Sequence, residues 1–303
     1  MKKISLLVLS AFLFFLNGNL FAQVIDEDEE TSNWDSFYER SNNNRAKKPF
    51  AYPYVRAADV VWQQRVWRTV DFREKMNQPF YFPRPSDDNP GEGAGLQGRA
   101  NLFTVLDRAL KDGTIKCYAD DEFKVEISYD SVMSWFRKSH LERKFIDNID
   151  DPDGEQIETD VEVFEEFKED EVQSMRIKED WYVDKQRSVR DVRIIGFCLV
   201  GKVQEGQGDA AEMKNRPMGW IRYNDPAVRN LLANSEMYNP RNDVQQISYD
   251  DVFVKRLFSS YVTRTSNTYN RQISGYLSGL DALLESDLIE EEIFNREQDM
   301  WEY

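Results

Sequence analysis

Residues 175–223 constrain the fold most, because they hold the most strand-like and the most apolar segments of the chain. Aromatic and β-branched residues lie among charged ones at the start of this stretch, and large apolar residues alternate with small or charged ones at its end. The run 192–200 between them is almost continuously apolar, which is typical of a central strand. We therefore expect strands at about 177–184, 189–200 and 218–223.

The connections between these strands predict how they pair. Residues 185–188 are short enough for a hairpin turn, whereas 201–217, with glycines and charges, predict a longer surface loop. The sequence thus indicates an α+β protein with a central, mainly antiparallel sheet and packed amphipathic helices.

Several amphipathic helices are expected to cover the sheet. In 59–76 the apolar residues Trp62, Val66 and Val70 recur every four positions after a capping Asp59. The sequences Ser128-Tyr129-Asp130 and Ser248-Tyr249-Asp250 each place a serine cap before acidic first-turn residues. Further helices are predicted at 101–111, 226–234, 248–262 and 276–302, with an extended segment at 80–83 and two short strands within 115–127.

The last predicted helix combines apolar and acidic residues. A terminal amphipathic helix usually docks on its own domain, and its acidic outer face could equally meet a basic partner. The expected apolar contacts are Leu280, Leu283, Leu284, Leu288, Phe294 and Trp301.

The first 22 residues predict a signal peptide, because two lysines precede a short apolar run and a small-residue site ending at Ala22. Neither cysteine lies at that site, so we expect no lipid anchor. No later segment approaches the roughly 20 apolar residues that span a bilayer, so no direct membrane insertion is expected. The mature chain is then divided into a flexible arm at 23–50 and one α+β domain at 51–303.

The mature chain is strongly acidic. Removing Lys2 and Lys3 with the signal leaves 37 basic and 55 acidic residues, a formal charge of −18. Such a charge repels nucleic acid and anionic lipid and favours basic partners or divalent cations. Thirteen acids and one lysine fall within 147–171, which we interpret as a solvated acidic insertion.

The chain has two cysteines, Cys117 and Cys198. In an oxidising compartment they could form a disulfide, but Cys198 lies in the predicted central strand, where a free thiol behaves as a small apolar residue. The buried, unpaired interpretation is favoured.

Three sequence features resemble parts of catalytic or ligand-binding motifs, but the residues around each of them do not fit the motif. Residues 93–98 match G-x-G-x-x-G, but a proline-bounded acidic loop precedes them in place of a strand. His140, the single histidine, lies in a predicted charged helix end without a nucleophile elbow or a second histidine. Residues 147–154 resemble part of a calcium loop, yet Ile149 stands at the first ligand position. We therefore assign no catalytic, cofactor-binding or metal-ligating residue.

Several segments together resemble the GldN family, called PorN in some members, of the type IX secretion and gliding machinery of Bacteroidetes. They occur in order over most of the mature chain. The resembling segments are 59–62 through 73–79, 101–113, 178–181 through Gly196, and 250–253 through 301–303. The acidic insertion and the arm depart from the family pattern.

The resemblance implies a non-enzymatic periplasmic subunit without cofactor. It implies a multimeric ring with the lipoprotein GldK on the inner face of the outer membrane, and contact with the periplasmic part of the motor protein GldM. A different class stays open: a periplasmic hydrolase or ligand-binding protein using Gly93 and His140. A third possibility is a calcium-regulated interaction module that uses 147–171.

Overall fold

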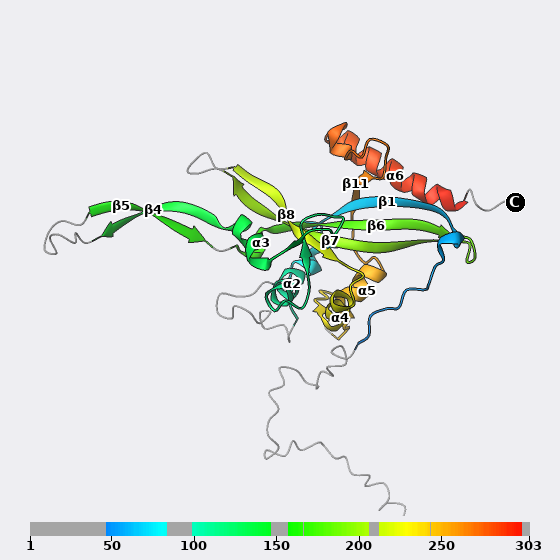
Figure 1. The fold of residues 1–303 in the computed structure, drawn as a ribbon, viewed down its shortest axis with the longest axis horizontal. Coiled ribbons are helices and arrows are strands. Elements are labelled where there is room, and N and C mark those ends of the chain that lie inside the picture. The colour runs from blue at the N-terminus through cyan, green and yellow to red at the C-terminus, as the bar shows by residue number, and fades with distance from the viewer. Residues whose placement is uncertain are drawn as a thin grey trace, which may run out of the picture. The chain divides into compact units, whose positions relative to one another are not determined.

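The computed structural model describes residues 47–83, 99–146, 157–165, 167–205, 212–242 and 244–298 (Figure 1). Within them a seven-stranded antiparallel sheet has the order β11-β1-β6-β7-β8-β2-β3. Its strands are β1 (Val60–Asp71), β2 (Cys117–Tyr118), β3 (Glu126–Ile127), β6 (Val172–Asp184), β7 (Val189–Glu205), β8 (Glu212–Arg222) and β11 (Tyr261–Thr265). The smaller pairs are β4 (Lys138–Ile146) with β5 (Ile157–Glu165), and β9 (Glu236–Met237) with β10 (Ile247–Ser248). The predicted α+β class is confirmed.

The three strands predicted within 175–223 form the centre of this sheet. They correspond to β6, β7 and β8, and 185–188 joins β6 to β7 as a tight turn. In each antiparallel pair, residues directly opposite one another point to the same side of the sheet. Ile177, Phe197 and Ile221 are opposite one another and are all buried, so they form one row of the core.

The prediction of a surface loop over 201–217 was wrong for most of its length. β7 continues to Glu205 and β8 begins at Glu212, with Val203 opposite Lys214. Pro217 lies within β8 although proline cannot donate to a ladder. The register shifts between Cys198 and Val200, next to the point where Val200 faces Pro217, and such an irregularity accommodates the proline.

The prediction of a helix over 59–76 was also wrong, because this segment forms β1 after the short 3-10 turn η2 (Ala57–Asp59). Val66 and Val70 share a buried face in the strand. A spacing of four residues is even, so it also repeats on one face of a strand, whose period is two. Most of the residues between Val60 and Val70 are β-branched or aromatic, which favours the strand.

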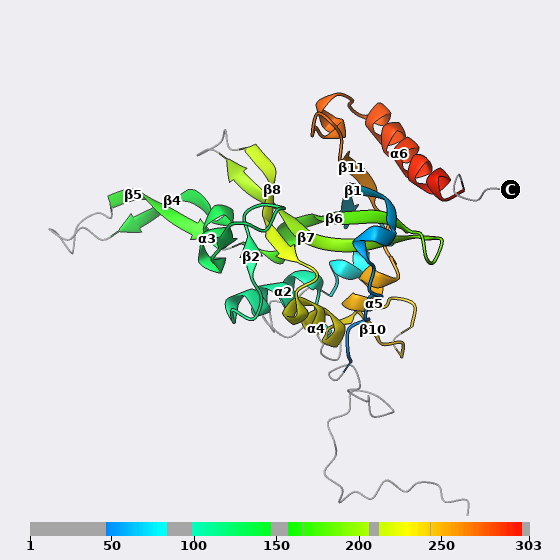
Figure 2. The same cartoon turned by 45° about the vertical axis from the view of Figure 1, so that its right-hand side comes forward.

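Helices α2 (Leu102–Lys111), α4 (Pro226–Asn234) and α5 (Tyr249–Val254) lie together on one side of the long strands (Figure 2). Asn101 caps α2, with its side chain accepting from the Thr104 amide at 2.7 Å. Ser128 caps α3 (Tyr129–Phe136) and Ser248 caps α5, as predicted. The main core between these helices and the sheet includes Val70, Phe80, Leu106, Met175, Phe197, Leu199, Leu232 and Phe253.

The helix predicted over 248–262 ends early, at Val254. The Leu257 amide donates to the Val252 carbonyl at 3.0 Å, and Arg256 adopts a left-handed conformation with φ of 53°. This is a Schellman ending, which reverses the chain into β11. The Arg256 guanidinium donates to the fully buried Glu179 carboxylate at 2.8 Å, and this ion pair holds the uncommon conformation in place.

The segment 80–83 was predicted to be extended, but Phe80 ends the 3-10 turn η3 (Gln78–Phe80) and Tyr81 continues as a turn. Phe80 is buried and stacks on Phe72, with ring centroids 5.8 Å apart. The turn therefore places an aromatic side chain in the core.

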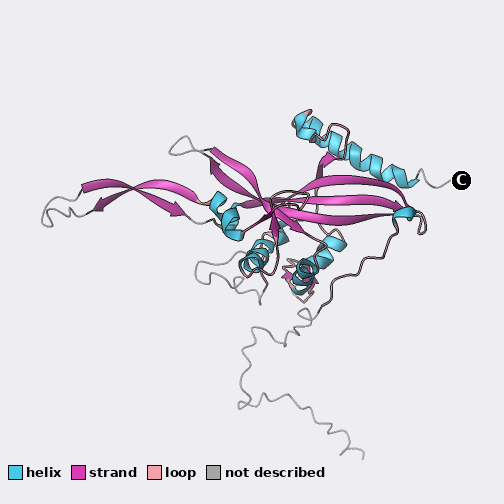
Figure 3. Ribbon diagram, in the orientation of Figure 1, coloured by secondary structure: helices cyan, strands magenta, loops and turns pink. Residues whose placement is uncertain are grey.

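The predicted acidic insertion contains one strand of a hairpin. β4 pairs with β5 from Lys138 opposite Glu165 to Ile146 opposite Ile157, and the pair extends away from the main sheet (Figure 3). The prediction that His140 belongs to a helix end was wrong, because it lies in β4. A further part of 147–171 forms the short turn η4 (Glu169–Glu171), which leads into β6. Charge repulsion did not prevent strand pairing here, since β4 supplies three basic residues, of which Lys138 lies opposite Glu165 and Arg143 opposite Asp160.

The segment before β1 is held by a buried carboxylate. Asp250, with 4% of its side chain exposed, accepts from Arg229 Nε at 2.6 Å and from the Tyr223 hydroxyl at 2.9 Å. The Phe50 backbone amide also donates to Asp250, at 3.0 Å, and Arg229 donates to the Phe50 carbonyl at 2.7 Å. One charge pair thus joins α4, α5, the end of β8 and the entry to β1.

Cys117 and Cys198 are both free and buried, in agreement with the favoured interpretation. Burial raises the pKa of the Cys117 thiol to about 11 and that of Cys198 to about 12. Because the thiolate is the reactive form, we expect iodoacetamide at pH 8 to alkylate neither in the native protein. Both should be alkylated in guanidinium chloride without reductant, as measured by intact mass. Native labelling would contradict the burial, and absent labelling after unfolding would indicate a disulfide.

Residues 43–303 form one structural unit. The described part contains no helix that is long and apolar enough to cross a membrane. The predicted signal peptide at 1–22 and nearly all of the arm at 23–50 lie outside the described residues.

Candidate interaction surface

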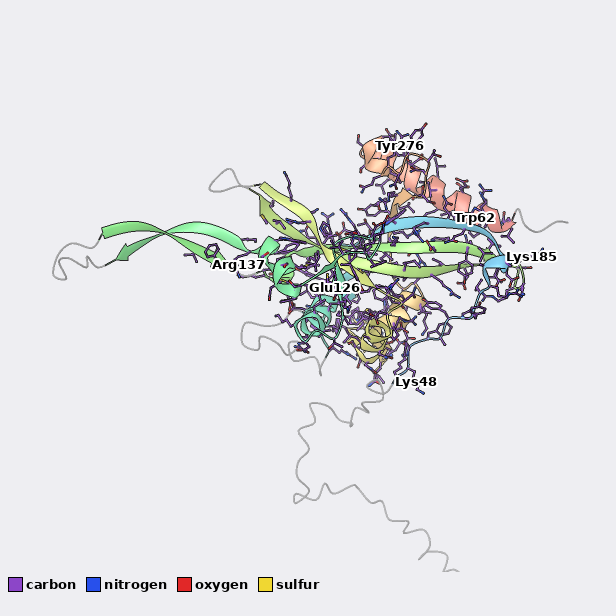
Figure 4. All side chains as sticks on the ribbon, viewed as in Figure 1. Lys48, Trp62, Glu126, Arg137, Lys185 and Tyr276 are labelled. Carbon is purple, nitrogen blue, oxygen red and sulfur yellow. The ribbon has the colours of Figure 1, made fainter. Side chains whose placement is uncertain are left out.

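The C-terminal helix α6 (Leu280–Gln298) docks beside β11 through one of its faces. Ile293 is buried with Val66 and Val262, and Trp62 of β1 packs against this second, smaller core (Figure 4). The Ser286 hydroxyl, also buried, accepts from the Val262 amide at 2.8 Å. The helix therefore covers an edge amide of the sheet as well as apolar surface.

Charged groups add to this docking. Arg68, 8% exposed at its side chain, forms an ion pair with Glu290 of α6, and its Nε donates to the Ser260 hydroxyl at 2.9 Å. Arg190 donates to the Ile293 carbonyl at 3.1 Å and stacks over Phe294 at 5.4 Å. A cavity of about 440 Å³ remains between these groups. Because both arginines reach α6 from the sheet, the helix has a defined orientation.

The opposite face of α6 is apolar and uncovered. Its large side chains are at least half exposed: Leu280 (71%), Leu283 (50%), Leu284 (52%), Leu288 (59%) and Phe294 (53%). Leu280, Leu284 and Leu288 follow at a spacing of four, so they form one stripe. We call Leu280, Leu283, Leu284 and Leu288 the leucine face. A helix that is apolar on both sides is normally buried on both sides, and contiguous exposed apolar residues mark interaction sites.

The leucine face was predicted as the part of α6 that contacts its own domain, and this prediction was wrong in its residues. The helix does dock, but through Ala282, Ser286, Ile289 and Ile293. The sequence alone does not show which of two apolar stripes on a helix docks on the domain, because both stripes recur with the helical period.

Acidic side chains surround the leucine face. Asp281, Asp287, Glu291 and Glu292 are all exposed, and Arg296 is the one basic residue of the helix. Arg296 is paired with Glu292 at 3.1 Å. The outward side of α6 therefore combines leucines with acidic side chains, because Asp287 and Glu291 follow the leucines at spacings of three and four residues.

Strongly buried acids in the described part of the chain have structural partners. Asp250 is held by Arg229, and Glu179 by Arg256 and the Trp181 indole at 3.0 Å. Among the described residues no three His, Cys, Asp or Glu side chains gather as a metal site would require. The sequence motifs do not come together as a site either, because 93–98 and 147–154 lie outside the described residues and of His140 only the backbone is placed, in β4.

The fold and this surface define an α+β protein with a docked helix that presents apolar side chains outward. The model of the family described as gliding motility associated protein GldN matches residues 55–302. The chain therefore belongs to the GldN family, whose members are components of the gliding motility and type IX secretion apparatus. No curated protein matches the chain.

Proposed function

We propose that this chain is a non-enzymatic structural subunit of the type IX secretion and gliding apparatus. It works in the periplasm, at the inner face of the outer membrane, to which partners attach it. There it forms a ring complex with a GldK-like lipoprotein and contacts the periplasmic part of a GldM-like motor protein. Family membership supports the apparatus, and the leucine face of α6 is the observation that supports assembly.

The charge around the leucine face favours a partner surface different from α6 itself. Two α6 helices packed face to face would bring Asp281, Asp287 and Glu291 of each copy close to those of the other, and like charges oppose such contact. A contact between two unlike surfaces is heterologous, and repeated heterologous contacts close into rings when the rotation allows. The leucine face thus fits a basic, apolar surface in a ring-forming contact.

Affinity purification of the tagged full chain from the cell envelope tests this function. The proposal predicts that a GldK-like lipoprotein copurifies and that electron microscopy of the eluate shows large rings. A lone monomer at low salt, without lipoprotein, would contradict it. The competing enzyme or ligand-binding function predicts that His140→Ala stops secretion, whereas the structural function predicts normal secretion by that variant.

A further inference from the structure

The side of the sheet away from the main core carries a polar groove. Thr69, Arg176, Cys198 and Trp220 are directly opposite one another across four neighbouring strands, so they form one row on this side. The next row runs Trp67, Lys178, Gly196 and Arg222. The loop between β2 and β3 covers part of the second row, because the Phe123 ring packs directly on Gly196.

The uncovered part of these rows forms a cavity of about 760 Å³. The segment from Gln272 to Leu283, which includes η6 (Ile273–Gly275) and the start of α6, forms one wall. Strands β1, β6, β7, β8 and β11 contribute the floor and the other walls. This volume lies within the range of about 300–1,000 Å³ typical of ligand sites.

Four of the charged residues that line the groove lie in ion pairs, and the two exceptions are the exposed Glu74 and Arg176 on the floor. Asp71 pairs with Arg73 at 2.6 Å, and Asp121 pairs with Arg264 at 3.0 Å. Arg176 is half-buried and makes no hydrogen bond or ion pair with any other described residue. Since an unpaired, partly desolvated charge is costly, the floor of the groove offers a positive charge to a ligand.

The second arginine in the groove, Arg264, is held by Asp121 and by an aromatic ring. The Arg264 guanidinium stacks on the Trp67 ring, with its central carbon 3.5 Å from the ring centroid. Its Nε is buried without a hydrogen-bond partner among the described residues. Because this Nε is buried and the guanidinium is already paired with Asp121, Arg176 is the cation that the groove offers to an anion.

The other residues that line the groove suit a bound peptide rather than a small ion. Apolar surface comes from Trp67, Val200, Trp220, Ile273 and Ala282, and polar side chains come from Thr69, Ser174, Asn215, Thr263 and Ser274. A free inorganic anion would satisfy Arg176 and leave this lining unused. An extended peptide uses both, because its backbone needs hydrogen-bonding groups and its alternate side chains need apolar contacts.

We propose that this groove binds an extended acidic segment of a partner protein. A carboxylate of the segment pairs with the Arg176 guanidinium, and apolar residues next to it pack on Trp67 and Trp220. The groove shares Leu283 with the leucine face, but the proposed contact on its floor at Arg176 does not depend on the proposed ring.

The probe for the test is a fluorescein-labelled nine-residue peptide of alternating glutamate and valine, and the control peptide has glutamine in place of glutamate. Anisotropy is measured at about 0.15 M salt, where charge interactions beyond ~8 Å are screened. We expect the acidic peptide to bind the mature chain at least tenfold more tightly than the control peptide. Free glutamate at an equal carboxylate concentration should not displace it, whereas displacement would indicate a site for small anions and overturn the proposal.

Two variants locate the binding. Arg176→Gln should lower the affinity for the acidic peptide about tenfold or more. The control is Arg241→Gln, which changes an exposed arginine in the turn between β9 and β10 and should leave this affinity unchanged. Ser274→Trp, at an exposed position on the rim, should block the groove and weaken the binding of both peptides. Equal binding of the two peptides, or unchanged binding by Arg176→Gln and Ser274→Trp, would overturn the proposal.

Discussion

Replacing Asp250 with alanine is expected to lower the free energy of unfolding by about 3–5 kcal/mol, because it leaves the Arg229 guanidinium buried without its carboxylate. The same change removes the acceptor of the Tyr223 hydroxyl and of the Phe50 amide. Guanidinium chloride unfolding followed by tryptophan fluorescence measures the loss. The entry to β1 should also become more sensitive to protease, since Asp250 fixes it.

The matched control is Asp287→Ala, which removes an exposed acid that makes no ion pair with another described residue. Changes at such surface positions are usually within about 0.5 kcal/mol. A loss of less than about 1 kcal/mol for Asp250→Ala would show that the Arg229–Asp250 cluster does not hold these elements together.

The second large effect is expected on assembly rather than on folding. In the double variant Leu284→Gln/Leu288→Gln, two exposed apolar side chains become polar while the helix propensity changes little. If each leucine contributes about 1.5 kcal/mol to the contact, the partner should bind about a hundredfold more weakly. Copurification of the envelope partner with the tagged chain measures this loss.

The control for that variant is Leu284→Met/Leu288→Met, which keeps the apolar surface and should keep the partner. The melting temperatures of both double variants should match the unchanged chain, because α6 docks through Ile289 and Ile293. A normal partner yield from the glutamine variant would show that the leucine face is not the contact. A lowered melting temperature would show that these leucines support the fold instead.

The centre of the sheet could be predicted because its signal is local. The run Val192–Val200 is apolar without a helical period, and the strands on either side alternate. β1 could not be predicted in the same way, since Trp62, Val66 and Val70 satisfy both periods. Its β-branched content favoured a strand, but its pairing with β6 depends on residues more than a hundred positions away.

The outer parts of β7 and β8 and the β4–β5 hairpin could not be predicted from the local sequence, because their pairing depends on distant residues. Residues 201–205 and 212–217 are polar and glycine-containing, and they become strand because they continue a ladder that the core has already aligned. In the same way the acidic β5 is paired because β4 lies opposite it. Composition alone indicated solvated loops in both places.

The interaction surface could be predicted from the sequence only in part. The leucines and acids of α6 could be read from the sequence, but which stripe faces outward depends on Arg68, Ser286 and the position of β11. The groove could not be predicted, because Arg176, Arg264 and Trp220 come together only through the register of five strands.

Photocrosslinking in living cells tests whether the leucine face of α6 is an assembly contact. A photoreactive phenylalanine analogue at Leu284 lies in the leucine face, and one at Tyr54, which is 88% exposed, serves as the control position. We predict an adduct between the chain and an envelope partner from Leu284 and none from Tyr54. If Leu280, Leu284 and Leu288 all fail to give an adduct in secreting cells, the leucine face is not an assembly contact.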